Sequence, residues 1–232
     1  MECRPGSLPE PVDNWPNPPS PRLVTKKKTL TAAERDPWER ALFALQQATL
    51  DATDLVVLDE FGANVDMQRT YAWAPKGERA VASAPRNTPI NTTTIAAMTP
   101  EGMRPSLVIS GGVDQGTLAA YLEQVLAPSL RAGQIVLADN LSAHKSARAQ
   151  EIIARCGCRL LYVPAYSPDY SPIELAIAKI KVELQRLAAR SREALEVAIG
   201  KALAQISAAE ARAFFLQCGY RFLPDLDQWF CS

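Results

Sequence analysis

The sequence predicts an α/β fold in which a mixed sheet is flanked by helices, and three observations support this. Short apolar runs at residues 54–58 and 134–138 have the length and composition of buried strands, and each leads into an aspartate. Strand-like segments come first and then alternate with helices, which is the order expected of a mixed sheet covered by helices. Residues 114–130 carry apolar side chains on one helical face.

Composition divides the chain into an arm, a leading segment, a main domain and a tail. Residues 1–28 hold many prolines and end in three lysines, which predicts a disordered Pro-rich and basic arm. Residues 29–53 predict a leading helical segment that starts at the capping-box pattern of residues 31–34 and bends or restarts near Pro37. The main domain is expected at residues 54–220, with a C-terminal tail at 221–232.

The main domain is expected to alternate strands with helices. Further strands are predicted at residues 68–74, 92–98, 105–110 and 159–163. Helices are predicted at residues 114–130, 144–155, 171–189, 192–207 and 210–217. Turn-forming residues at 75–77 and 99–102 separate the early strands.

Charge and cysteine content narrow the classes of function. Basic and acidic residues balance at 25 each, which is unusual for a nucleic-acid enzyme unless the basic residues cluster on one face or a DNA-gripping part is missing. The five cysteines form no CxxC pair, so a zinc ribbon is not expected. The cysteines are instead expected to be reduced thiols in the cytosol. The sequence has no apolar run of membrane-spanning length and no secretory signal pattern at its start.

Three acidic residues form the candidate site: Asp59 and Asp139 at the ends of apolar runs, and Glu174 at the start of a helix. Acids delivered from strand ends and a helix start can converge, and converging carboxylates are costly unless cations lie between them. Such a trio suits two magnesium ions for phosphodiester chemistry. In the alternative interpretation, Asp59 and its neighbour Glu60 only end a strand and meet water. Side chains on a strand alternate, so these two cannot both face one site.

Glu174 also has a structural alternative. Residues 171–174 (Ser-Pro-Ile-Glu) have capping-box spacing, with proline at the first helical position, so Glu174 can instead bond back to the Ser171 backbone. Pro164, Pro168 and Pro172 stiffen the segment before it. A fixed path is what an acid needs to meet two distant strands, and this favours the functional interpretation.

Two polar residues after Asp139 extend the candidate site. Asn140 is placed to hydrogen-bond a ligating carboxylate or a phosphate oxygen, and His144 to orient the metal ligands. His144 is the only histidine, which is too little for a zinc site, and its alternative role is a helix-start residue satisfied by backbone.

Several stretches in fixed order resemble a known family. They are the Asp59–Glu60 pair with residues 69–77 (Arg-Thr-Tyr-Ala-Trp-Ala-Pro-Lys-Gly), Asp139 and Asn140 with His144 and Lys145, and residues 166–174 (Tyr-Ser-Pro-Asp-Tyr-Ser-Pro-Ile-Glu). From about residue 26 to 220 the chain resembles the DDE transposases of the mariner superfamily, most nearly their bacterial insertion-sequence branch. That branch has the 34-residue gap seen here between Asp139 and Glu174 (DD34E).

The resemblance implies an RNase H-like fold with a central mixed sheet of five strands flanked by helices. It implies that Asp59, Asp139 and Glu174 are the catalytic metal ligands, holding two Mg²⁺ or Mn²⁺ ions. It also implies cleavage and strand transfer at the terminal inverted repeats of a mobile element, insertion at TA, and a homodimer on double-stranded DNA. A cytoplasmic, nucleoid-associated bacterial protein is the matching location.

Departures from the family pattern leave every acid in place. Ala165 and Ser171 replace a proline and an asparagine of the family loop, and Ala72 replaces a glycine. Backbone contacts to DNA are assigned, weakly, to basic residues after the second acid: Lys145, Lys179, Lys181, Arg186 and Arg190. Their alternative is a solvated helix face. Tyr71 and Trp73 are expected to pack in the core rather than to stack on a base.

Family members normally carry helix-turn-helix modules before the catalytic domain. Only residues 1–58 precede Asp59 here, and many are proline, so no such module is expected. The chain is therefore predicted to be a catalytic part that works with the product of an upstream helix-turn-helix frame. The alternatives are an inactive relic that only binds DNA or oligomerises, and a cellular RNase H-like nuclease.

Overall fold

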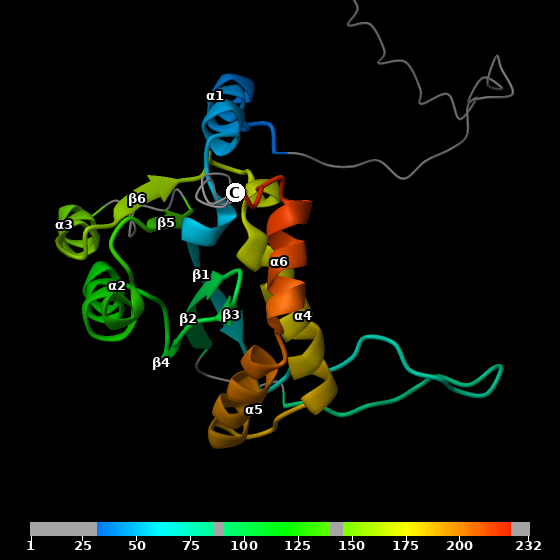
Figure 1. Ribbon diagram of the computed structural model, residues 1–232. Coiled ribbons are helices and arrows are strands. Elements are labelled where there is room, and N and C mark those ends of the chain that lie inside the picture. The colour runs from blue at the N-terminus through cyan, green and yellow to red at the C-terminus, as the bar shows by residue number, and fades with distance from the viewer. Residues whose placement is uncertain (1–31, 86–90, 140–145, 224–232) are drawn as a thin grey trace, which may run out of the picture. The chain divides into compact units, whose positions relative to one another are not determined.

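The computed structural model describes residues 32–85, 91–139 and 146–223, shown as coloured ribbon in Figure 1. The chain divides into two compact units, residues 1–33 and 34–232, and the fold given below is that of the second unit. The predicted arm of residues 1–28 and the tail from residue 224 lie outside the described residues. No helix in the described ranges is both long and apolar enough to cross a bilayer.

Six strands in the described part of the chain form one mixed sheet in the order β3-β2-β1-β5-β6, with β4 also pairing with β2. The strands are β1 (Leu55–Ala63), β2 (Thr92–Thr99), β3 (Gly102–Met103), β4 (Leu107–Ser110), β5 (Ile135–Ala138) and β6 (Arg159–Tyr162). β2 runs antiparallel to β1, whereas β1, β5 and β6 are parallel. β3 and β4 pair with different halves of the free edge of β2, so six strands fill the five predicted positions.

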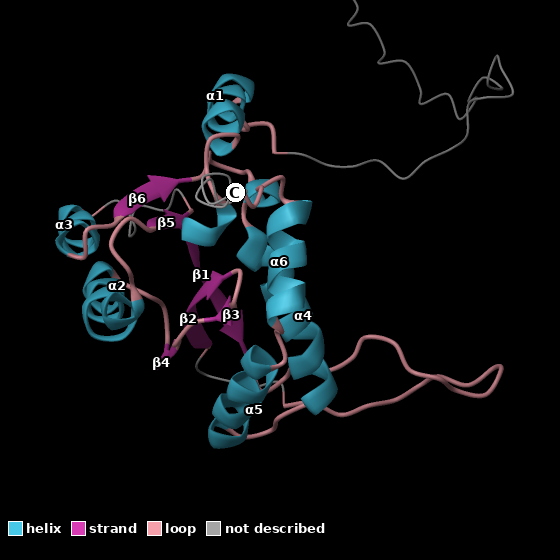
Figure 2. Ribbon diagram, in the orientation of Figure 1, coloured by secondary structure: helices cyan, strands magenta, loops and turns pink. Residues whose placement is uncertain are grey.

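Helices cover both faces of this sheet (Figure 2). The described residues form α1 (Pro37–Gln47), α2 (Gln115–Tyr121), α3 (Ala147–Arg155), α4 (Pro172–Leu187), α5 (Arg192–Ala204) and α6 (Ala208–Gln217). Short turns of helix lie at Ala52–Asp54, Leu122–Leu126, Ala127–Ser129 and Pro168–Tyr170. The α2 and α3 side chains pack on one face, and those of α4, α5 and α6 pack on the other.

The alternation of side chains along β1 builds the two halves of the core. Leu55 and Val57 belong to the cluster on the α4 face, whereas Val56 and Leu58 belong to the cluster on the α2 face. All four are buried, as expected for a central strand covered on both sides. The apolar run that predicted this strand is therefore apolar because both of its faces are inside.

The start of α1 differs from its prediction. The helix begins at Pro37, and the Asp36 carboxylate caps it by accepting from the backbone N–H groups of Trp38 (2.7 Å) and Glu39 (3.2 Å). Proline fits the first helical position because its missing N–H has no partner there. The helix therefore begins at Pro37, in agreement with the predicted restart there and not with a bend. Thr31, which opened the predicted capping box, lies outside the described residues.

The predicted strand at residues 68–74 is wrong. Residues 64–85 form a long loop after β1 (Figure 2), and Tyr71 and Trp73 are 90% and 103% exposed. The expectation that these two aromatic rings pack in the core is therefore also wrong. A further strand would have to pair with the free edge of β2, but β3 and β4 already pair with that edge.

Candidate active site

The parallel register of β1 and β5 places Asp59 beside Asp139. The last bridged pair of these strands is Leu58 with Ala138, so the next residue on each chain is an aspartate. By alternation both aspartates follow the α4 face of the sheet, whereas Glu60 follows the opposite face. β5 ends at Ala138, so its pairing with β1 stops one residue before Asp59.

Asp59 does not end its strand, contrary to the prediction. β1 continues to Ala63 because β2 pairs with it along its whole second half, with Asp59 opposite Ala96. At Asp59, β1 is therefore paired with β2 on one side, whereas its pairing with β5 on the other side has already ended. A side chain in this position is fixed by the sheet and still reaches the space above the end of β5.

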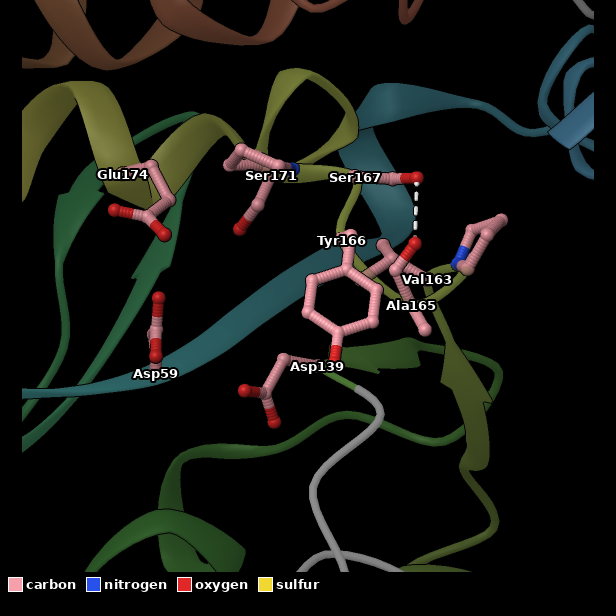
Figure 3. Close-up of a pocket in the computed structure, with 10 residues that line it drawn as sticks. Asp59, Asp139, Val163, Ala165, Tyr166, Ser167, Ser171 and Glu174 are labelled. Carbon is pink, nitrogen blue, oxygen red and sulfur yellow. Dashed lines mark hydrogen bonds between the residues drawn. The ribbon is translucent and has the colours of Figure 1, made fainter. Parts of the chain in front are cut away.

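Glu174 is the third residue of α4, and its carboxylate reaches back over Asp59 (Figure 3). The Ser171 side chain makes no hydrogen bond that caps this helix. The Glu174 N–H instead bonds the Ser171 carbonyl at 3.2 Å. The capping box of the alternative interpretation is therefore not formed, and the Glu174 side chain points toward Asp59 (Figure 3). The buried apolar face of α4, including Ile173 and Ile177, holds the helix on the sheet.

The three acids line one cavity of about 400 Å³. Asp59, Asp139 and Glu174 contribute from β1, the end of β5 and α4, as Figure 3 shows. The rest of the wall comes from the segment between β6 and α4: Val163, Pro164, Ala165, Tyr166, Ser167, Pro168 and Ser171. The cavity therefore lies where three separate elements end or begin, beside the carboxyl ends of parallel strands.

The Asp59 carboxyl has a pKa raised from 3.8 to about 7. Loss of hydration on burial is the main cause, and the negative charges of Glu174 and Asp139 add to it. The Glu60 backbone N–H donates to Asp59 Oδ1 at 2.7 Å and opposes the rise. The three acids are thus close enough for their charges to raise the free energy of ionising Asp59.

The chemistry of this donor set fits a hard divalent cation. The three elements contribute the carboxylate oxygens of Asp59, Asp139 and Glu174 to the cavity, and such oxygens suit Mg²⁺ or Mn²⁺. A cation between them would offset the repulsion that raises the pKa of Asp59. In the described ranges, no three Asp, Glu, His or Cys side chains are already spaced to grip an ion.

The basic residues assigned to DNA contact on α4 and after it are mostly engaged within the chain. Lys179 pairs with Glu210, and Arg186 pairs with an acid one turn earlier on the same helix. Arg190 donates to two backbone carbonyls at the base of the loop after β1, at 2.8 and 3.0 Å. Lys181 makes no hydrogen bond or ion pair with the residues that the structure describes. Their role toward DNA stays a prediction.

Three predicted site residues, Asn140, His144 and Lys145, lie outside the described residues. In the other direction, the structure adds Tyr166, which sequence reasoning placed in a motif but not in the site. Tyr166 has a left-handed backbone with φ of 55° and lines the cavity beside Asp139 (Figure 3). A non-glycine residue in this region is uncommon and costs backbone strain. The signal available in the sequence was its place in a proline-bounded loop just after a strand.

Comparison with known proteins agrees with this geometry. The sequence profile of the DDE superfamily endonuclease family matches residues 54–196, which is more than half of the chain. This range contains all three acids, the central strands β1, β2 and β5, and α4. No curated protein matches the sequence.

Solved structures of Mos1 transposase share the fold. The Mos1 transposase paired-end complex with left transposon end is 14% identical, with a TM-score of 0.67 over 87% of this chain and 68% of that one. The mariner Mos1 paired end complex with Mg is 14% identical, with a TM-score of 0.65 over 86% and 64%. The catalytic domain of Mos1 mariner transposase is 13% identical, with a TM-score of 0.54 over 78% and 84%.

This chain thus spans about two-thirds of the transposase chains in the complexes and most of the isolated catalytic domain. The likeness establishes the RNase H-like fold that the sequence predicted, a mixed sheet flanked by helices. Together with the family match over the segment that holds the acids, it places the protein: the chain belongs to the DDE superfamily endonuclease family.

Proposed function

We propose that this chain is the catalytic part of a transposase that cuts and joins DNA strands with divalent metal ions. The observation that supports it most is the convergence of Asp59, Asp139 and Glu174 on one cavity from three elements, with the pKa of Asp59 raised. The family match and the likeness to Mos1 complexes with Mg and with Mn point to the same chemistry.

In this proposal the three carboxylates hold two Mg²⁺ or Mn²⁺ ions. When bound there, such ions would supply Lewis-acid chemistry, in which a water or a 3′-hydroxyl is activated as nucleophile and the leaving oxygen of the phosphodiester is stabilised. Asp59 and Asp139 follow a bridged pair of residues on neighbouring strands, so their carboxylates would hold a cation together. Glu174 approaches from above on α4. Each acid must be ionised to bind, so Asp59 has to lose its proton first.

The substrate proposed is double-stranded DNA at the terminal inverted repeats of a bacterial insertion sequence, with TA as target and a homodimer on the DNA. Mos1 structures with transposon ends support a DNA substrate of this kind. Lys145, Lys179, Lys181, Arg186 and Arg190 are proposed to contact the phosphate backbone, and Asn140 and His144 to orient the ligands. Reading of the repeat ends is assigned to the product of an upstream helix-turn-helix frame, in the cytoplasm at the nucleoid.

The test is Mg²⁺-dependent nicking of a supercoiled plasmid that carries the element ends, with the upstream frame product present. Asp139→Asn removes one ligand charge and keeps the size of the side chain. We expect it to slow nicking by more than about 100-fold, since even residues that only support metal ligands cost about 10- to 100-fold. Circular dichroism should show an unchanged fold.

Glu60→Gln is the matched control, because Glu60 is next to Asp59 on β1 but follows the opposite face of the sheet. It should nick at the wild-type rate within a few fold. If Asp139→Asn nicks as fast as the wild type, the assignment is wrong. If the wild type itself never nicks this plasmid, the proposed function fails in favour of the inactive relic or of a nuclease that acts on another nucleic acid.

A further inference from the structure

The leading helix α1 is joined to the segment before α4 by a charged cluster. Arg40 donates to both carboxylate oxygens of Asp169, from Nη1 at 3.1 Å and from Nη2 at 2.7 Å. Arg35 donates to the same carboxylate. Asp169, in the segment between β6 and α4, thus accepts from two guanidinium groups that lie about 130 residues earlier in the chain. The Arg40 contact is bidentate, which is the stronger kind of ion pair.

Aromatic contacts strengthen the same junction. The Arg40 guanidinium lies over the Tyr170 ring, 4.4 Å from its centroid, and the Tyr170 hydroxyl donates to the Arg40 carbonyl at 3.3 Å. The Phe43 ring of α1 packs against Tyr170 with centroids 4.8 Å apart. From the other side, the Tyr220 hydroxyl donates to the Tyr170 carbonyl at 2.8 Å. Tyr170 is therefore held from both sides.

The junction is placed where it sets the path of the chain into Glu174. Asp169 and Tyr170 belong to the single turn Pro168–Tyr170, which leads through the N-cap residue Ser171 into α4. Backbone bonds close this turn, from the Tyr170 N–H to Ser167 (3.1 Å) and from the Ser171 N–H to Pro168 (3.0 Å). Ser167 and Ser171 are buried and line the cavity of the three acids.

The ion pairs are partly protected from water. The side chains of Arg40 and Arg35 are 18% and 24% exposed, whereas that of Asp169 is 49% exposed. Burial alone raises the pKa of Asp169, but the hydrogen bond from Arg40 and the charges of both arginines outweigh it and hold the pKa below its ordinary value. Exposed single pairs contribute little, but a bidentate pair within a network that also stacks on a ring is the exception.

We propose that Arg40 is a positioning residue, which holds the Asp169–Tyr170 turn so that Glu174 faces Asp59 and Asp139; the metal part of this inference rests on the proposed function. It explains why a helix that precedes the catalytic strands is packed on the segment that carries the third acid. Loss of Arg40 should let this turn move and should move Glu174 away from the other two acids.

The test combines hydrogen exchange with Mn²⁺ binding, using the full chain. In Arg40→Gln, the amides of Tyr170 and Ser171 should exchange faster than in the wild type, and those of the central strands should not. The dissociation constant for Mn²⁺, read by electron paramagnetic resonance, should rise about tenfold, as for other residues that orient metal ligands. Asp169→Asn should act in the same way, and the double variant should add little to either single one.

Arg155→Gln is the matched control. It also removes an arginine from an ion pair, with Glu123 at 2.8 Å, but on α3, on the other face of the sheet. It should leave both readouts unchanged. Should Arg40→Gln fold poorly, Asp169→Asn carries the test, since it keeps both arginines.

Unchanged exchange at Tyr170 and Ser171 in both variants overturns the inference. So does faster exchange with an unchanged Mn²⁺ affinity, because the junction then holds the turn without positioning Glu174. If the wild type binds no Mn²⁺ at all, the proposed function fails. The exchange result then decides by itself whether Arg40 holds the turn.

Discussion

Asp59 is the residue at which the cost of building this site is concentrated. Its carboxyl loses hydration and meets two further acids, so its pKa rises from 3.8 to about 7. In the unfolded chain no such shift is expected. Between about pH 4 and pH 7 the folded protein keeps a proton that the unfolded chain has lost, so the free energy of unfolding falls as the pH rises. Above about pH 7 the full penalty is present.

A neutral replacement at this position should therefore stabilise the protein without metal. We expect Asp59→Asn to raise the free energy of unfolding at about pH 8 by on the order of 2 kcal/mol, from the conversion of a pKa shift to free energy. The gain should shrink toward about pH 4. Urea unfolding at several pH values in the presence of a chelator measures it.

Magnesium should reverse this order, because bound cations stabilise only the wild-type site. A variant that is less stable than the wild type at about pH 8 in chelator would contradict the account of Asp59.

At the scale of elements, two helix starts that look alike in sequence differ in structure. Both α4 and α6 follow a serine with a glutamate three residues later, at Ser171 and Glu174 and at Ser207 and Glu210. Ser207 and Glu210 form the full capping box, with side chain and backbone bonded in both directions. Ser171 forms no side-chain cap, so Glu174 is left for the cavity.

Substitution of the two serines should therefore have unequal effects on stability. Ser207→Ala should lower the free energy of unfolding by about 1 kcal/mol, the usual cost of losing an N-cap. Ser171→Ala should cost less than about 0.5 kcal/mol, since no capping bond is lost. Urea unfolding of the two variants in chelator makes the comparison. Equal losses would mean that Ser171 caps α4 in solution.

Local sequence predicted the elements better than it predicted their pairing. The apolar runs gave β1 and β5 because strands buried on both faces must be apolar throughout. The end of β1 was missed, because its second half is set by pairing with β2 rather than by its own composition. Trp73 was misplaced because an aromatic residue is usually buried, whereas here the sheet edge is taken by other strands.

The three acids of the candidate site were predicted from the sequence, whereas the residues that hold them in place were not. Acidic residues that follow apolar runs are visible in a sequence. That acids at two strand ends can converge was also expected from the sequence, but the register that puts Asp59 beside Asp139 is a tertiary property set by the pairing of β1 with β5. The contact of Arg40 with Asp169 joins residues 129 positions apart. Asp169 lies in the motif of residues 166–174, but nothing in the sequence pairs it with Arg40.

For the whole molecule, the two halves of the core have different tasks. The half under α2 and α3 covers one face of the sheet. The half under α4, α5 and α6 covers the other face and holds α4 where Glu174 reaches toward Asp59. The same half includes α1 through Phe43. The site is thus assembled from parts of the chain that are brought together only when the domain folds. Because the net charge of the chain is zero, the electrostatics of the site depend on the charges of nearby residues.

The central claim is that these three distant acids together hold divalent cations, and anomalous diffraction from crystals soaked in Mn²⁺ tests it most directly. We expect two peaks, roughly 3.5–4 Å apart, between the carboxylates of Asp59, Asp139 and Glu174. In crystals of Asp139→Asn both peaks should weaken or vanish. Peaks held by other residues, or a well-ordered site without any peak at high Mn²⁺, would contradict it.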